Sequence, residues 1–152
     1  MTTTTTLAEL PGLVGQELGT SDWYEVTQEA VNQFADATND HQWIHVDVER
    51  AKAESPFGGP IAHGFMTLSL LVPLASSTYK ITDAKMGVNY GLNKVRFPAP
   101  VPVGSKLRAR VVLQDSKPIA GGVQNTLAVT VEREGGDKPV CIAEWVSLAY
   151  GG

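Results

Sequence analysis

The stretch Phe65-Met-Thr-Leu-Ser-Leu-Leu-Val-Pro-Leu-Ala75 decides the fold of this chain. Its apolar residues occupy every side of a helical wheel, so the pattern predicts a helix that is buried nearly all round. The stretch is well short of the roughly 20 apolar residues that a membrane span needs, and it contains Thr67, Ser69 and Pro73. A helix of this kind needs other parts of the protein around it.

Strand-like sequence follows the helix and can supply that cover. From residue 106 to residue 113 apolar and polar residues alternate, which is typical of a strand with one dry face. Two further long segments, 123–132 and 140–150, are separated by a turn sequence at 135–139. We therefore expect a curved antiparallel sheet wrapped around a central helix, in the α+β class.

Upstream of the central helix the pattern is helical. Apolar residues recur at three- and four-residue steps over 27–38, which predicts an amphipathic helix capped by Thr27. Asp47 can cap a second short helix that ends before the helix-breaking residues 55–60. We expect residues 1–10 to be a loosely ordered polar end of a single domain that spans residues 1–152.

Composition limits the class of protein. The chain has 152 residues and a net charge of −4 without a cluster of Lys and Arg, which argues against nucleic acid or an anionic membrane as a partner. One cysteine, Cys141, cannot form an intrachain disulfide. The Thr-rich start does not have the pattern of a signal peptide, so we expect a cytoplasmic protein. Only 18% of residues are charged, which hints at further covered surface such as a subunit interface.

The main candidate for chemistry is the polar group Asn39-Asp40-His41-Gln42-Trp43-Ile44-His45. On a continuous helix Asp40 and His45 would lie about 140° apart, so they converge only if the chain turns, and Asn39 and Asp40 both suit a helix end. A carboxylate and an imidazole that converge can position and deprotonate a water. The alternative is a turn aspartate and a partly buried histidine, neither with a catalytic role.

A second constellation, Gly59-Pro-Ile-Ala-His63-Gly64, leads directly into the central helix. Free backbone N–H groups at the helix start, at a residue without a Cβ, could form an oxyanion hole at Gly64. Equally, Gly64 could serve only tight packing. The three histidines with Asp40 could also suggest a metal site, but the chain has neither a His-x₃-His helix pair nor a thiolate set.

Two cations, Lys94 and Arg96, lie near the start of the predicted sheet. Because they are two residues apart, they share one face of a strand. Such a pair could meet the phosphates of an anionic ligand, or it could simply be a solvated face.

Three motifs follow one another along the chain. They are Phe34-Ala-Asp-Ala-Thr-Asn-Asp40-x₄-His45, Phe57-Gly-x-Pro-Ile-Ala-His63-Gly64-Phe-Met-Thr-Leu and Tyr90-Gly-x-x-Lys-Val-Arg-Phe-Pro-x-Pro-Val-x-x-Gly104. Together they resemble the MaoC-like family of (R)-specific enoyl-CoA hydratases, and most of all its small stand-alone mycobacterial members. The resemblance implies the hot-dog fold, an antiparallel sheet around a long central helix, in a homodimer whose sheets join edge to edge.

The resemblance also implies an activity in fatty acid metabolism. This is the reversible syn addition of water to a trans-2-enoyl-CoA, giving an (R)-3-hydroxyacyl-CoA, with no metal or organic cofactor. Asp40 and His45 match the catalytic pair that holds the water and acts as general base and acid. Gly64 matches the glycine whose N–H binds the thioester oxygen.

One part of the motif departs from the family pattern. The common Gly-Asp-x-Asn-Pro-hydrophobic-His has its Asn-Pro step replaced by Gln42-Trp43. This puts the acyl chain-length preference in doubt more than the reaction. The residues that we expect to bind substrate are His63, Gln42, Trp43, Phe57, Lys94 and Arg96.

Two other functions fit the same fold. A hot-dog acyl-CoA thioesterase would hydrolyse the C–S bond, but the Asp-x₄-His pair with a following His-Gly is the hydratase arrangement. A non-catalytic acyl-CoA-binding or scaffold subunit of a dehydratase would usually lack the Asp or the His, and both Asp40 and His45 are present.

Overall fold

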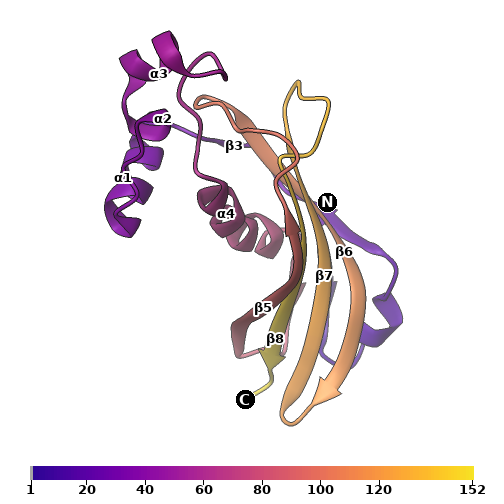
Figure 1. Cartoon of the computed structure of the whole chain (residues 1–152). Coiled ribbons are helices and arrows are strands. Elements are labelled where there is room, and N and C mark those ends of the chain that lie inside the picture. The colour runs from indigo at the N-terminus through magenta and orange to yellow at the C-terminus, as the bar shows by residue number, and fades with distance from the viewer. Residues whose placement is uncertain (1) are drawn as a thin grey trace.

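The computed structural model describes residues 2–152 and shows a curved sheet with one helix in its concavity (Figure 1). Neighbouring strands of the main sheet pair in the order β2-β6-β7-β8-β5, all antiparallel, and the two-residue β3 also pairs with β6. The predicted α+β wrap and its long strands are confirmed. The strand bounds are β2 Glu17–Thr20, β3 Tyr24–Glu25, β5 Met86–Arg96, β6 Lys106–Ile119, β7 Gly122–Arg133 and β8 Cys141–Tyr150.

The inner face of the sheet is apolar along β6 and β7, where most alternate residues are small or branched hydrophobes. In β6 the buried positions include Ala109 and Val111, and their register partners on β7, Val131 and Val129, are buried too. Such rows of branched side chains across neighbouring strands pack well on a pleated surface. These side chains form the apolar surface against which the central helix packs.

The central helix, α4 (Gly64–Ser76), packs on the concave face with Leu71 and Leu74 turned inward. The prediction that it is buried nearly all round is wrong. Phe65 is 71% exposed, and Ser69 and Pro73 are exposed as well. The sheet covers one side of the helix, and the described residues leave the other side open (Figure 1).

The N-terminal segment is more ordered than we expected. Within residues 1–10, β1 (Thr3–Thr5) pairs in parallel with β4 (Tyr79–Ile81), and Leu10 is 1% exposed at the start of the 3-10 helix Leu10–Leu13. The pairing of β1 with a distant strand has no local sequence signature, so the Thr-rich stretch resembled a loose end. Residue 1 lies outside the described residues.

Three short helices form a group beside α4 (Figure 1). They are α1 Gln28–Thr38, α2 Trp43–Val46 and α3 Val48–Glu54. Both predicted caps are confirmed: the Ala30 N–H donates to Thr27 Oγ1 at 3.1 Å, and the Arg50 N–H donates to Asp47 Oδ1 at 3.1 Å. Across residues 2–152, none of the helices combines the length and apolar character that crossing a bilayer requires.

Candidate active site

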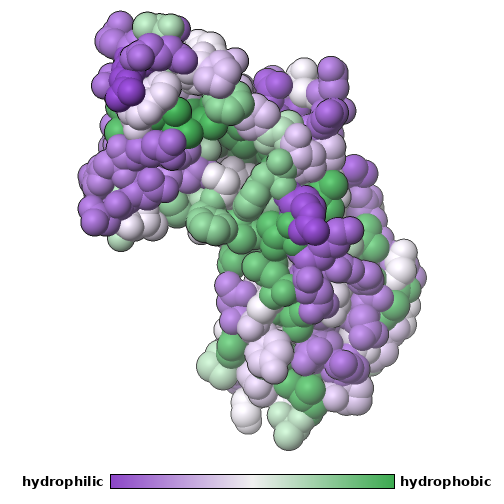
Figure 2. Space-filling model, viewed as in Figure 1, coloured by the Kyte–Doolittle hydropathy of each residue, from purple (hydrophilic) through white to green (hydrophobic). Residues whose placement is uncertain are grey.

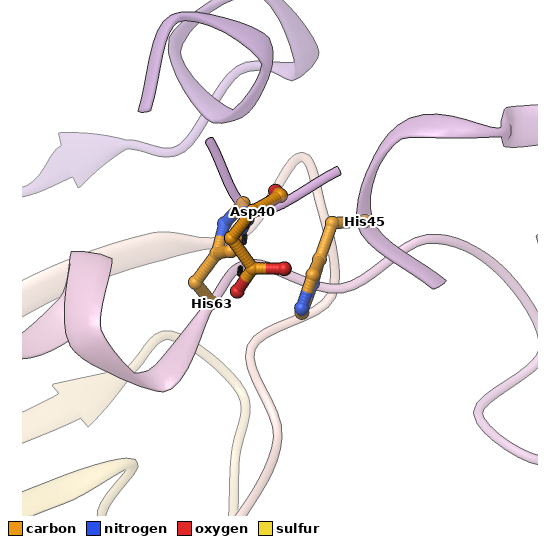
Figure 3. Close-up of side chains that lie close together, drawn as sticks. All are labelled: Asp40, His45 and His63. Atoms are coloured by element: carbon orange, nitrogen blue, oxygen red, sulfur yellow. Dashed lines mark hydrogen bonds and ion pairs between the residues drawn. The ribbon is translucent and has the colours of Figure 1, made fainter. Parts of the chain in front are cut away.

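A sharp turn after α1 brings Asp40 toward α2. Asn39 adopts the left-handed conformation, with φ 59° and ψ 31°, which asparagine tolerates better than most residues. The Asp40 N–H then donates to the Ala35 carbonyl at 3.1 Å and closes the helix end. The chain therefore turns where the convergence of Asp40 with His45 requires it, and Figure 3 shows the two side chains close together.

The His45 ring is held in one orientation and one tautomer. It is 7% exposed, and its Nδ1 lies 2.7 Å from the Ile61 carbonyl oxygen. Because a carbonyl only accepts, Nδ1 carries the hydrogen and Nε2 of the neutral ring keeps a lone pair. Burial lowers the pKa of His45 below 6.5, and the nearby His63 lowers it further, against the opposing effects of the Ile61 hydrogen bond and Asp40. His45 is therefore neutral at neutral pH, and its Nε2 can accept a proton.

His63 lies behind this pair. Its Nε2 donates to the backbone carbonyl of Asp40 at 3.0 Å, and its ring stacks on His45 with centroids 3.8 Å apart and planes 24° apart. The side chain is 3% exposed. His63 is thus turned toward the two candidate catalytic residues.

Asp40, His45 and His63 also have the residue types of a metal site, since one potential ligand atom from each lies within 4.8 Å of the others. Two of the ring nitrogens, however, already donate to backbone carbonyls, and the Nδ1 of His63 is enclosed without a hydrogen-bond partner among the described residues. The Asp40 carboxylate and the Nε2 of His45 are left to act together. Two acceptors that converge suit a water, which has two hydrogens to donate.

Gly64 begins α4, and its N–H has no partner within the helix. A Cβ at this residue would lie 3.3 Å from Cδ2 and Cε2 of Phe97, so the Phe97 ring packs closely against the helix start. A cleft of about 300 Å³ opens here. Its lining residues are Phe57, Ile61, Gly64, Thr67, Phe97, Pro98, Ala99, Pro100, Val101 and Val140. Ile61 connects this cleft to the site, because its carbonyl holds His45.

The other residues of the Asp-x₄-His loop lie outside the cleft. The Gln42 side chain is exposed, and its backbone N–H donates to Asp40 Oδ1 at 3.4 Å. The Trp43 ring packs under the Arg50 guanidinium, 4.3 Å from its carbon to the ring centroid. Phe57, in contrast, lines the cleft and is 47% exposed.

Lys94 and Arg96 share one face of β5, as the spacing predicts. They stand on either side of Val95, whose register partner Ala143 is buried in the core. Both cations are exposed and therefore point away from α4, and neither lines the cleft.

Sequence reasoning missed two contributors. Gln28 on α1 donates from Nε2 to the His45 carbonyl at 2.8 Å and so ties α2 to α1. Phe97 covers Gly64 from the loop after β5. Phe97 stands in the third motif and could have been found there, whereas an exposed-looking helix residue such as Gln28 carries no signal.

Comparison with known proteins gives a consistent result. A family model described as MaoC like domain matches residues 9–135. A protein of Mycobacterium tuberculosis named 3-hydroxyacyl-thioester dehydratase Z is 56% identical over 145 residues, which cover 95% of each chain. Nodulation protein N of Rhizobium meliloti is 50% identical over 145 residues, covering 94% of this chain and 90% of that protein.

Solved structures share the fold. An (R)-hydratase from A. caviae involved in PHA biosynthesis has a TM-score of 0.72 at 25% identity, over 88% of this chain and 94% of that one. An R-hydratase from Pseudomonas aeruginosa has a TM-score of 0.78 at 22% identity, over 97% and 86% of the two chains. The antiparallel sheet around a central helix is therefore the hot-dog fold that the motifs implied.

Proposed function

The chain belongs to the MaoC-like domain family, and from that premise we propose that it is an (R)-specific hydro-lyase acting on acyl thioesters. It interconverts a trans-2-enoyl-CoA and an (R)-3-hydroxyacyl-CoA by adding or removing water. Because acyl-CoA thioesters are intermediates of cytoplasmic fatty acid metabolism, we also propose that the protein acts in the cytoplasm.

The observation that carries the proposal is the convergence of Asp40 and His45 beside the start of α4. The carboxylate and the Nε2 lone pair of His45 can each accept one hydrogen of a single water. That water keeps a lone pair on its oxygen for attack on Cβ of the substrate. Gly64 offers an N–H at the positive end of the helix dipole for the thioester oxygen.

The proposed hydration needs only these groups to account for both protons of the water and for the electrons of the double bond. The water oxygen forms a bond to Cβ as one of its protons passes to the Asp40–His45 pair, and the π electrons move to give an enolate on the thioester oxygen. Hydrogen bonding from Gly64 stabilises that developing charge. Cα then takes a proton from the same pair. Because both acceptors lie on one side of the substrate, hydroxyl and hydrogen add to the same face, which is syn addition.

We propose supporting roles for the peripheral residues. Phe57 shapes the acyl side of the cleft, which its position in the lining supports. Arg96 directly precedes the cleft-lining residues that begin at Phe97, so Lys94 and Arg96 would meet the phosphates of CoA outside the cleft. Lys94→Ala and Arg96→Ala should then raise KM and leave kcat unchanged. Gln42 and Trp43 act through the shape of the loop, the first by its N–H to Asp40.

We propose that the working form is a homodimer joined along β5. This strand pairs only with β8 among the described strands, so its outer edge is free. Phe65 on α4 is 71% exposed, and Tyr90 and Leu92 on β5 are 65% and 41% exposed. Figure 2 shows apolar residues in the hollow between the α1–α3 helices and this side of the sheet. Apolar exposure of this kind is typical of an interface, and light scattering on the purified protein tests it.

The test of the activity is loss of enoyl-thioester absorbance when the protein is added to crotonyl-CoA or a longer enoyl-CoA. Asp40→Asn and His45→Gln should each lower kcat by about 10²–10⁴-fold, the range for a lost acid–base group. Asp36 and His41 provide a matched control, because they form another carboxylate–imidazole pair, at 2.9 Å, on the exposed surface. The double variant Asp36→Asn/His41→Gln should keep the wild-type rate.

The same experiment separates the alternatives. Release of free thiol from a saturated acyl-CoA would identify a thioesterase. A folded protein that binds acyl-CoA without turnover would identify a non-catalytic subunit. Wild-type rates in Asp40→Asn or His45→Gln would contradict the mechanism, even if hydration occurs.

A further inference from the structure

We propose that His63 is a positioning residue that fixes Asp40 and His45 relative to Gly64, and that it does so as the Nε2–H tautomer without contacting substrate. The inference rests on the function proposed above. His63 is the residue directly before Gly64 and the N-cap of α4, so its backbone is continuous with the start of the helix. Its side chain reaches away from the helix to both members of the candidate catalytic pair.

The contact with Asp40 is to the main chain. His63 Nε2 lies 3.0 Å from the Asp40 carbonyl oxygen and 4.0 Å from its Oδ2. On the other side, the Asp40 N–H is held by the Ala35 carbonyl at 3.1 Å. The two peptide groups that flank Asp40 are therefore both fixed. Among the described residues, the half-exposed carboxylate accepts only the long bond from the Gln42 N–H, so the main-chain contacts fix the point from which the carboxylate extends.

The contact with His45 is through the ring face. Stacking at 3.8 Å covers one face of His45, while the hydrogen bond from its Nδ1 to Ile61 fixes rotation in the ring plane. Phe34 also packs against His63, with ring centroids 4.9 Å apart and planes 53° apart, so the His63 ring contacts a second aromatic ring. One buried side chain thus sets the relative placement of the carboxylate, the imidazole and the helix start.

The chemistry of the position explains why it holds a histidine. The site needs a flat ring to stack on His45 and a donor at the far end of that ring. Phenylalanine offers the ring without the donor, and glutamine offers a donor without the ring. Histidine supplies both but leaves its Nδ1 enclosed and without a partner among the described residues. An enclosed, unpaired acceptor is unfavourable, and phenylalanine would avoid it, so the Nε2–H donor is what histidine adds here.

The first test uses the wild-type protein and needs no substrate. Nitrogen-15 NMR of the histidine rings at about pH 8 distinguishes the two neutral tautomers. We expect His63 in the Nε2–H form, hydrogen-bonded, and His45 in the Nδ1–H form. An Nδ1–H tautomer at His63 would overturn the proposal, whatever the protein's activity proves to be.

The second test compares His63→Phe, His63→Gln and the exposed control His41→Gln. His63→Phe keeps the ring stack but loses the donor, so kcat should fall about 100-fold, as expected for a small misplacement of reacting groups, while KM stays nearly unchanged. His63→Gln restores the donor and should recover part of kcat. Without His63, the pKa of His45 should rise in an NMR titration, and His41→Gln should leave both readouts as in wild type.

Two outcomes would reject the positioning role. A folded His63→Phe with wild-type kcat would show that His63 only packs. A raised KM with kcat unchanged would make His63 a substrate-binding residue. Absence of turnover in the wild type would count against the proposed function instead, and the tautomer measurement would still test the Nε2–H contact of His63 with Asp40.

Discussion

Gly64→Ala separates the chemical role of the helix start from its role in packing. The new Cβ would lie 3.3 Å from two ring carbons of Phe97, so the ring must shift by a few tenths of an ångström. Phe97 is 42% exposed and has room to do so. Gly64 does not have a positive φ, so alanine introduces no backbone strain. Alanine also favours the helix by up to about 1 kcal/mol over glycine.

These terms nearly cancel, so the free energy of unfolding should change by less than about 1 kcal/mol, which limits the shift in Tm to at most about 2–4 °C for a chain of this size. Activity should respond quite differently. The methyl group stands beside the Gly64 N–H and 3.3 Å from Phe97, so we expect it to narrow the approach of the thioester oxygen. The rate should fall by about 10²–10³-fold, as it does when an oxyanion donor is lost.

The assay pairs thermal unfolding with initial hydration rates for Gly64→Ala and for a control, Gly12→Ala. Among the described residues other than its own chain neighbours, none places an atom within 4 Å of a Cβ added at Gly12, and the φ of Gly12 is not positive. The control should match wild type in both measurements. A Gly64→Ala protein with the wild-type rate would refute the assignment of Gly64. A Tm lowered by about 10 °C or more would show that the Phe97 ring cannot shift to make room for the methyl group.

Three further predictions follow from buried groups. The pKa of His45 lies below 6.5 in the folded protein, so the unfolded chain binds the proton first as pH falls, and acid therefore favours unfolding. Tm should be lower at about pH 5.5 than at about pH 7.5, and His45→Gln should weaken that dependence. Burial raises the pKa of Cys141 to about 11, so a thiol reagent at about pH 8 should label it only after unfolding, and rapid labelling of the native protein would contradict its burial. Trp145 donates from Nε1 to Asn89 Oδ1 at 2.8 Å, so Trp145→Phe should cost about 1 kcal/mol or more in a urea unfolding curve, and an unchanged midpoint would show that the bond contributes nothing.

The parts of the site that sequence predicts are those encoded within a few residues. Asn39 at a helix end is a local signal for the turn, and the turn decides whether Asp40 and His45 meet. The cap at Asp47 and the alternation in β6 are equally local. Each of these features survives in the folded chain because no distant contact competes with it.

The parts that escaped prediction depend on distant contacts. The ring of His63 turns toward a loop 23 residues earlier in the chain, and nothing in its own segment specifies that direction. Trp43 lies under Arg50 because α3 folds back across α2, which a linear motif does not convey. The apolar residues on the outer side of α4 resembled core because a helical wheel cannot say which parts of a surface one chain leaves uncovered.

The free edge of β5 has a consequence for which chains can add to it. Its register against β8 is interrupted at two places, between Asn89 and Gly91 and between Leu92 and Lys94. A regular strand from an unrelated protein cannot hydrogen-bond along the whole of an edge with two such irregularities. Lys94 also places a charge on this strand, which disfavours pairing with foreign strands. A partner strand would need irregularities that match these two in order to pair along its whole length. We therefore expect the edge of β5 to accept a foreign strand poorly, which lowers its tendency to aggregate.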